Sequence, residues 1–169
     1  VRHGRVLLSE DEHIEALYLE VVDFLAENGI KQYEVSNFAR PGAESRHNGN
    51  YWLRKPWLGL GSAAHGCYGP RRYANTSDID QYMDWVEAGR FPESMVDPLN
   101  LTARLLERLI LGLRTSRGVP LSWLDEKSLD LKAGLKGGLW LVEDRYLKLT
   151  ARGFLLIDSI EEMVRPACR

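Results

Sequence analysis

YEVSNFARPGAESRHNGNYWLRKPWLGLGSAAHGCYGPRRYAN, residues 33–75, is the stretch from which the organisation of this chain can be worked out. It contains two of the four histidines, several aromatic residues and a glycine-rich turn, and it has few of the apolar repeats that predict helices. Imidazoles, aromatic rings and glycines all have uses beyond packing. We therefore expect a functional site here, flanked by two regions that form mainly scaffold.

Composition excludes several classes of protein. With 44% hydrophobic and 27% charged residues, the chain has the composition of a folded globular protein rather than a disordered one. It has no apolar run of about 18 residues, so we expect no membrane span, and no leader typical of secretion. Cys67 and Cys168 are the only cysteines, too few for a disulfide framework. We expect a cytoplasmic protein. Because the first residue is Val, we also expect part of a longer or processed chain.

Charge and proline positions predict two domains. Residues 1–98 contain 10 Lys and Arg against 15 Asp and Glu, whereas residues 99–169 contain 12 against 9. Two prolines bracket a polar segment, FPESMVDP, at residues 91–98, which is typical of a link. The predicted domains are therefore 1–92 and 99–169. The positive excess of the second is too small to indicate nucleic-acid binding.

The first domain reads as an α/β unit. A capping box at Ser9 and Glu12, an apolar stripe and a closing Gly29 predict a helix over 9–29. A short strand follows at 30–35, then an irregular loop at 36–42. A second strand is expected at 57–60. A helix over 79–86, started by Thr76 and Ser77, has an apolar stripe that predicts core packing.

The second domain has a different pattern. An apolar helix is predicted over 101–113, two shorter helices over 120–127 and 128–136, and a β-hairpin at 139–142 and 146–149. A last helix begins after Thr150. This order is that of a winged-helix-like module, a fold that often binds DNA, although fold alone does not establish function. The expected recognition helix has only Lys132 and Lys136 as basic residues.

Several motifs in this order resemble one family. The segments YEVSNFAR at 33–40, HNGNYW at 47–52 and LGLGSAAH at 58–65 resemble the HemW-like radical SAM proteins. Downstream, LGLR at 111–114, GV at 118–119 and LTARG at 149–153 resemble the C-terminal module of the same family. Its members are often labelled oxygen-independent coproporphyrinogen III oxidase-like and are regarded as haem chaperones. The resemblance extends over nearly the whole chain.

The resemblance implies a fold and a set of site residues. The fold would be α/β: the C-terminal portion of an incomplete (β/α) radical SAM barrel, followed by the small winged-helix-like α+β domain. The haem-binding motif falls on His47, Asn48, Tyr51 and Trp52, with His47 as the candidate ligand of the haem iron. Residues on the S-adenosylmethionine side would be Gly59, Gly61, Ala64 and His65. His65 is also the alternative haem ligand, and Arg71 and Arg72 are either partners of haem propionates or solvated surface residues.

One departure from the family limits what the chain can do. Radical SAM proteins hold a [4Fe–4S] cluster on a C-x-x-x-C-x-x-C loop, in which three thiolates leave one iron free for S-adenosylmethionine. The sequence has no such loop. We therefore expect the cluster-binding N-terminal half to be missing and no radical chemistry from this chain alone. Half a barrel would leave a strand edge and a helix stripe uncovered, which predicts association of the isolated chain.

Three functions remain open. The first, which we favour, is a haem-binding chaperone that delivers haem to apoproteins. The second is a fragment of an oxygen-independent coproporphyrinogen III oxidase-type enzyme of porphyrin biosynthesis. The third is a winged-helix nucleic-acid-binding module, against which the weak basic face argues. The expected partners are haem, haem-receiving apoproteins and the missing half, with no nucleic acid.

Overall fold

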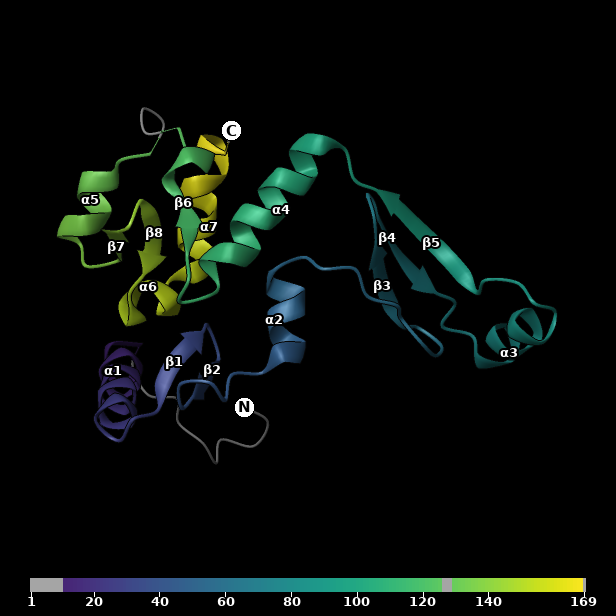
Figure 1. Ribbon diagram of the computed structural model, residues 1–169, viewed down its shortest axis with the longest axis horizontal. Helices are drawn as coiled ribbons and strands as arrows, with labels where there is room; N and C mark the ends of the chain where they lie inside the picture. Colours follow the sequence, from purple (N-terminus) through teal and green to yellow (C-terminus); the bar gives the residue numbers. More distant parts are fainter. Residues whose placement is uncertain (1–10, 126–128, 169) are drawn as a thin grey trace. The chain divides into compact units, whose positions relative to one another are not determined.

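The computed structural model describes residues 11–125 and 129–168, and it divides into two compact units (Figure 1). Unit 1 comprises Val1–Arg46 and Gly112–Arg169, and unit 2 comprises His47–Leu111. The architecture is mixed α/β, and every strand pairing in the described part of the chain is antiparallel. The domains 1–92 and 99–169, inferred from charge and prolines, stay a prediction.

The N-terminal part of unit 1 is a helix followed by a two-stranded ribbon. Helix α1 (Asp11–Glu27) ends just before Gly29, whose φ of +75° is a conformation that glycine adopts without strain. The Ser9 of the expected capping box lies outside the described residues. Strand β1 (Lys31–Glu34) pairs with β2 (Asn37–Ala39). The irregular loop predicted at 36–42 was therefore wrong in part, because the chain turns back on β1 at once.

The C-terminal part of unit 1 is a three-stranded sheet covered by helices. The strand order is β6 (Val119–Pro120), β8 (Tyr146–Leu149), β7 (Trp140–Glu143), which confirms the predicted hairpin. The helices are α5 (Leu131–Lys136), α6 (Ala151–Leu155) and α7 (Ile157–Val164), with 3-10 turns at Leu121–Trp123 and Arg165–Ala167. The residues that fill its core, each at most 5% exposed, are Val119, Trp140, Leu147, Phe154, Ile160 and Val164.

Two predictions for this part were wrong. A helix was predicted over 120–127, but strand β6 and a single 3-10 turn occupy its first residues, and residues 126–128 lie outside the described range. The last helix is divided into α6 and α7, with Leu156 between them. Thr150 does cap α6 as expected, because its hydroxyl accepts a hydrogen bond from the Gly153 amide at 3.0 Å.

Backbone hydrogen bonds join the ribbon to the C-terminal part. The Val35 amide donates to the carbonyl of Arg114 at 2.9 Å, and the Ser116 amide donates to the carbonyl of Tyr33 at 3.0 Å. Helix α1 also contacts α6, and the carboxylate of Glu15 pairs with Arg152 at 3.0 Å. Segments about eighty residues apart in sequence therefore form one unit.

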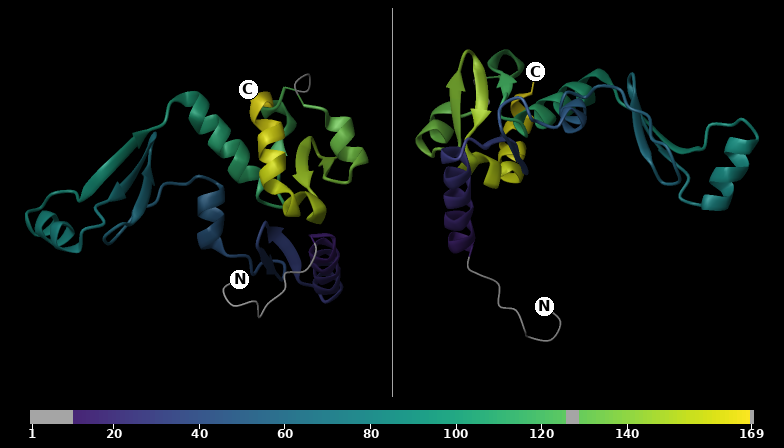
Figure 2. Two further views of the ribbon diagram at one scale, coloured as in Figure 1. Left: turned by 180° about the vertical axis from the view of Figure 1, so that it is seen from behind. Right: turned by 60° about the horizontal axis from the view of Figure 1, so that its bottom comes forward.

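Unit 2 consists of a meander sheet and its flanking helices. The strand order is β3 (His65–Tyr68), β4 (Arg71–Asn75), β5 (Glu93–Pro98). Helix α2 (Arg46–Trp52) precedes the sheet, α3 (Ile79–Glu87) connects β4 to β5, and α4 (Leu101–Leu113) follows and continues into unit 1. Both views in Figure 2 place α3 beyond the end of this sheet.

The structure corrects three expectations for unit 2. Residues 91–98 are not a link, since β5 pairs with β4 along its length. The strand predicted at 57–60 is reduced to one bridge between Trp57 and Cys67. Helix α3 exists, but it begins after Asp78 rather than Thr76 or Ser77, because the Asp78 carboxylate accepts from the Gln81 amide. Its apolar stripe is not core: Ile79, Met83 and Val86 are exposed.

None of the helices in the described residues has the length and apolar character needed to cross a membrane.

Candidate functional site

Helix α2 carries the four residues of the predicted haem motif. His47 and Tyr51 are four residues apart and therefore share one face of the helix. Their ring centroids are 4.9 Å apart and the planes meet at 89°, an edge-on contact. His47 is exposed and Tyr51 is half-buried. The helix thus presents an accessible imidazole fixed by a neighbouring aromatic ring. The structure places His47 within this helix.

A third ring extends this arrangement. Trp57 lies edge-on to Tyr51, with centroids 4.9 Å apart and planes at 81°. Its backbone is held by two hydrogen bonds with Cys67, of 2.8 and 3.0 Å, which fix the segment after α2 against strand β3. We call His47, Tyr51 and Trp57 the aromatic series. Trp57 was not among the predicted haem-binding residues, because its contact with Tyr51 depends on a bridge that local sequence does not indicate.

The other predicted residues lie near the series in sequence but are not part of it. Asn48 and Trp52 are half-buried on α2. His65 begins strand β3 and is exposed, and among residues 11–125 and 129–168 no ring contact joins it to the aromatic series. The roles assigned to these three residues stay predictions.

Internal hydrogen bonds fix the glycine-rich turn. The amide of Gly59 donates to the hydroxyl of Tyr73 and the amide of Gly61 to that of Tyr82, both at 3.0 Å. The side-chain amide of the buried Asn75 donates to the carbonyls of Gly59 and Gly61 at 3.1 and 2.8 Å. These contacts therefore determine the geometry of the turn.

Close packing explains why this turn has glycine at position 59. A Cβ atom there would lie 2.3 Å from the carbonyl oxygen of His65, which is closer than real Cβ contacts. Gly61 has a φ of +105°, which also favours glycine. Since both amides are already bonded to tyrosine hydroxyls, the S-adenosylmethionine contacts assigned to Gly59, Gly61, Ala64 and His65 stay predictions.

Carboxylates of the same unit pair with both arginines of strand β4. Arg71 forms a bidentate pair with Glu93, with hydrogen bonds of 2.9 and 3.1 Å. Arg72 bonds to Asp97 at 2.8 Å and to Glu107 at 3.1 Å, and the hydrogen bond with Asp97 is the main cause of the raised pKa of Arg72. Neither guanidinium is a free surface charge, so a ligand carboxylate would have to compete with these partners.

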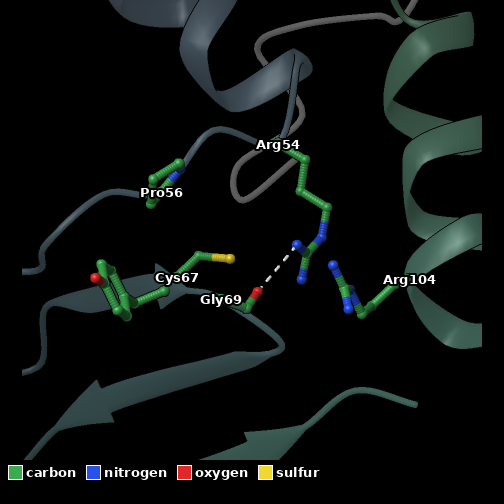
Figure 3. Close-up of a pocket in the computed structure, with 6 residues that line it drawn as sticks. Arg54, Pro56, Cys67, Gly69 and Arg104 are labelled. Atoms are coloured by element: carbon green, nitrogen blue, oxygen red, sulfur yellow. Dashed lines mark hydrogen bonds between the residues drawn. The ribbon is translucent and has the colours of Figure 1, made fainter. Parts of the chain in front are cut away.

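Unit 2 also contains a pocket of about 420 Å³ that sequence reasoning missed (Figure 3). The guanidinium of Arg54 extends into it from the segment after α2, and the guanidinium of Arg104 reaches it from α4. The thiol of Cys67 points into the same space, and burial raises the pKa of this thiol. No local pattern indicates the pocket, because its residues come from three separate segments: Arg54, Pro56, Cys67, Tyr68, Gly69 and Arg104.

Iron–sulfur chemistry does not fit the residues present. The two cysteines of the whole sequence cannot supply three thiolates. Within residues 11–125 and 129–168, no group of three or more histidine, cysteine or acidic side chains is arranged to hold a metal ion. A haem iron differs in needing only one protein ligand, such as an exposed histidine.

No protein-family model matches the chain, but individual relatives do. It is 33% identical over 169 residues to the heme chaperone HemW of Bacillus subtilis, covering 95% of this chain and 45% of that protein. It is 35% identical to HemW of Mycobacterium tuberculosis, and the match covers 95% of this chain and 41% of that protein. The mitochondrial radical S-adenosyl methionine domain-containing protein 1 of Danio rerio is 32% identical, and the match covers 95% of this chain and 40% of that protein. The chain spans less than half the length of these relatives.

A solved structure shares the fold. Coproporphyrinogen III oxidase (HemN) from Escherichia coli, described as a radical SAM enzyme, superposes with a TM-score of 0.67. The match covers 92% of this chain and 42% of that one, at 21% sequence identity. At this identity the likeness concerns the fold alone.

Proposed function

Since this chain is HemW-like in sequence over 95% of its length, we propose that it is the haem-binding part of a haem chaperone. The observation that supports the proposal best is the aromatic series, in which an exposed imidazole stands at the end of packed aromatic rings. The relatives named HemW supply the ligand class, and the structure supplies a side chain of suitable chemistry.

His47 is the proposed ligand of the haem iron. A neutral imidazole is a common axial ligand, and His47 is exposed and oriented by Tyr51. Tyr51 and Trp57 add flat apolar surface against which a porphyrin can pack. Asn48 and Trp52, the other residues of the motif, are proposed as neighbouring contacts, and His65 as the alternative ligand. The residues therefore fit a haem held by one histidine.

The longer protein is proposed to have a radical SAM barrel. In that assignment the elements up to residue 92 form the C-terminal part of an incomplete (β/α) barrel, and residues 99–169 form a winged-helix-like domain. The sheet β6-β8-β7 with α5, α6 and α7 supports the second assignment. S-adenosylmethionine and the [4Fe–4S] cluster would depend on the part of the protein that carries the cysteine loop, with Gly59, Gly61, Ala64 and His65 on the S-adenosylmethionine side.

Delivery of haem to apoproteins is proposed for the longer protein, in a cytoplasmic setting. The oxidase and nucleic-acid alternatives are not favoured. The relatives from Bacillus subtilis and Mycobacterium tuberculosis are named as chaperones. Helix α5 contributes only Lys132 and Lys136 as basic residues, which is a weak surface for a phosphate backbone.

A haem titration followed by absorption spectroscopy tests the proposal. We expect a saturable Soret shift with the wild-type chain and its loss in His47→Ala. His13→Ala is the matched control, because His13 is an exposed histidine on α1, outside unit 2. His65→Ala tests the alternative ligand. Equal spectra for wild type and His47→Ala would remove His47 as the ligand. No binding by any variant would contradict a haem site built by this chain alone.

A further inference from the structure

The pocket of unit 2 contains a buried cation that is only partly neutralised. The Arg54 side chain is 6% exposed. Its Nε donates to the Glu107 carboxylate, and its Nη1 donates to the carbonyl of Gly69 at 3.3 Å. Its remaining nitrogen, Nη2, is buried and has no hydrogen-bond partner in the described residues. Buried donors are rarely left unpaired, since the loss of water is then not compensated.

The pocket as a whole has a positive charge. Arg104 lines it, and no ion pair joins this guanidinium to the part of the chain that the structure describes. Glu107 is shared between Arg54 and Arg72, and Arg72 takes a second carboxylate, Asp97. The two carboxylates Glu107 and Asp97 therefore pair with Arg54 and Arg72, and Arg104 adds a further positive charge at the pocket wall. The Cys67 thiol adds no negative charge at neutral pH, because burial raises its pKa.

The size and walls of the pocket favour an organic anion. A volume of about 420 Å³ is well beyond the size of one bound ion and within the range of small-molecule sites. Pro56, Tyr68 and Cys67 supply apolar wall beside the two arginines. Figure 3 shows the guanidinium groups of Arg54 and Arg104 at the same side of this space. An acid with a carbon skeleton can fill the apolar part while its carboxylate meets the arginines.

We propose that this pocket binds the carboxylate group of an organic acid. Arg54 Nη2 and the Arg104 guanidinium donate to the carboxylate oxygens, in the geometry that guanidinium groups provide for carboxylates. Two sources can supply this group: the edge of a porphyrin, or a free small acid. The first source rests on the function proposed above, whereas the carboxylate site itself does not.

Calorimetric titration with succinate at constant ionic strength tests the site. We expect succinate to bind saturably to the wild-type chain. We expect Arg104→Met to bind succinate at least about tenfold more weakly than wild type, since a charge-assisted contact is lost. Arg104→Met leaves the Arg54–Glu107 pair in place, so we expect the variant to fold. Arg54→Lys, which keeps the charge but not the fork of donors, is expected to weaken binding similarly. Arg90→Met removes an equal charge from an exposed position outside the pocket and is expected to bind as wild type does.

The opposite results overturn the proposal. One is that succinate shows no saturable binding, and another is that wild type and Arg104→Met bind it with equal affinity. A third is that Arg90→Met weakens succinate binding as much as Arg104→Met does, which would indicate a non-specific charge effect. Tighter binding of inorganic phosphate than of succinate would also contradict the assignment of a carboxylate.

A comparison of haemin with haemin dimethyl ester distinguishes the two sources. Tighter binding of the free acid, with the difference removed by Arg104→Met, supports a porphyrin carboxylate. Equal binding of acid and ester, together with succinate binding that depends on Arg104, supports a free small acid. If neither porphyrin binds, and the wild-type chain and His47→Ala give the same absorption spectra with haem, the haem proposal fails. The succinate titration still decides whether the pocket is a carboxylate site.

Discussion

The indole ring of Trp140 lies against Gly134, so closely that a Cβ atom added to Gly134 would be 1.9 Å from a ring carbon. Trp140 is 2% exposed, and its Nε1 donates to the carbonyl of Leu131 at 3.1 Å. The ring is therefore fixed by both packing and a hydrogen bond. Helix α5 can approach strand β7 only because residue 134 has no side chain.

Gly134→Ala is expected to destabilise unit 1. Alanine favours a helix over glycine by about 1 kcal/mol. Overpacking a fixed core ring costs about 1–3 kcal/mol, and this contact lies at the severe end. We expect a net loss of about 2 kcal/mol in the free energy of unfolding, measured by urea denaturation.

Gly49→Ala is the matched control for this prediction. Gly49 is also helical, in α2, and apart from its chain neighbours and the helix backbone no described atom lies within 4 Å of a Cβ added there. The same substitution should therefore be neutral or stabilising by up to about 1 kcal/mol. A Gly134→Ala protein as stable as wild type would show that Trp140 can move.

Arg114 binds two carboxylates of α7 that should differ in importance. The Glu161 carboxylate is 2.6 Å away and 13% exposed, whereas the Asp158 carboxylate is 3.5 Å away and 93% exposed. Water screens an exposed pair strongly, and such pairs contribute about 0–1 kcal/mol. We expect Glu161→Gln to lower the free energy of unfolding by about 1–2 kcal/mol and Asp158→Asn to change it by less than about 0.5 kcal/mol. Equal effects in denaturation experiments would contradict this ranking.

Local patterns predicted those elements that form from local interactions. The hairpin of β7 and β8 and the helix over Leu101–Leu113 follow from periodicity and turn residues, and the structure confirms them. Strand β5 was missed because Pro92 and Pro98 suggested a link. Pro98 is compatible with a strand because β5 lies at an edge of the sheet, paired with β4 on one side.

The candidate site was predictable only where it depends on residues close together in the sequence. The spacing of His47 and Tyr51 would indicate one helix face, but α2 has no apolar periodicity that predicts a helix. The burial of Arg54 depends on Glu107, which lies 53 residues further along the chain. No sequence window contains both partners, so the pocket could be found only once the fold brought them together.

Asn75 is expected to stabilise the glycine-rich turn. Its side-chain amide satisfies the carbonyls of both Gly59 and Gly61, and it is 4% exposed. Asn75→Ala removes both hydrogen bonds and should cost about 1–3 kcal/mol. Faster hydrogen exchange of the Gly61 amide is the expected local sign. Asn50→Ala, at an exposed position of α2, should leave that exchange unchanged, and an unchanged rate in Asn75→Ala would contradict the prediction.

The Cys67 thiol is expected to react slowly at neutral pH. Burial raises its pKa, so the folded protein keeps the proton at pH values where an unfolded chain releases it. The stability that comes from keeping this thiol protonated in the fold is fully present below the usual thiol pKa of about 8.5. It is lost as the pH rises through the pKa of the thiol in the folded protein. In a Cys168→Ser background, Cys67 should react slowly with a thiolate-specific reagent at pH 7. The rate of modification should increase once the pH exceeds the usual thiol pKa of about 8.5. Equally fast reaction of the folded and the urea-unfolded protein at pH 7 would show that the thiol is neither buried nor shifted.

The apolar face of α1 is expected to cause association of the isolated chain. Phe24 is 64% exposed and Leu17 53% exposed, although both belong to a stripe of the kind that usually packs against a core. Phe24→Glu should reduce concentration-dependent association in sedimentation velocity experiments, because it removes an exposed aromatic ring from this face and adds a charge. Ala26→Glu adds the same charge at another exposed position of α1 without removing apolar surface, and it should have a smaller effect. A wild-type chain that stays monomeric at all concentrations would show that this face does not drive self-association.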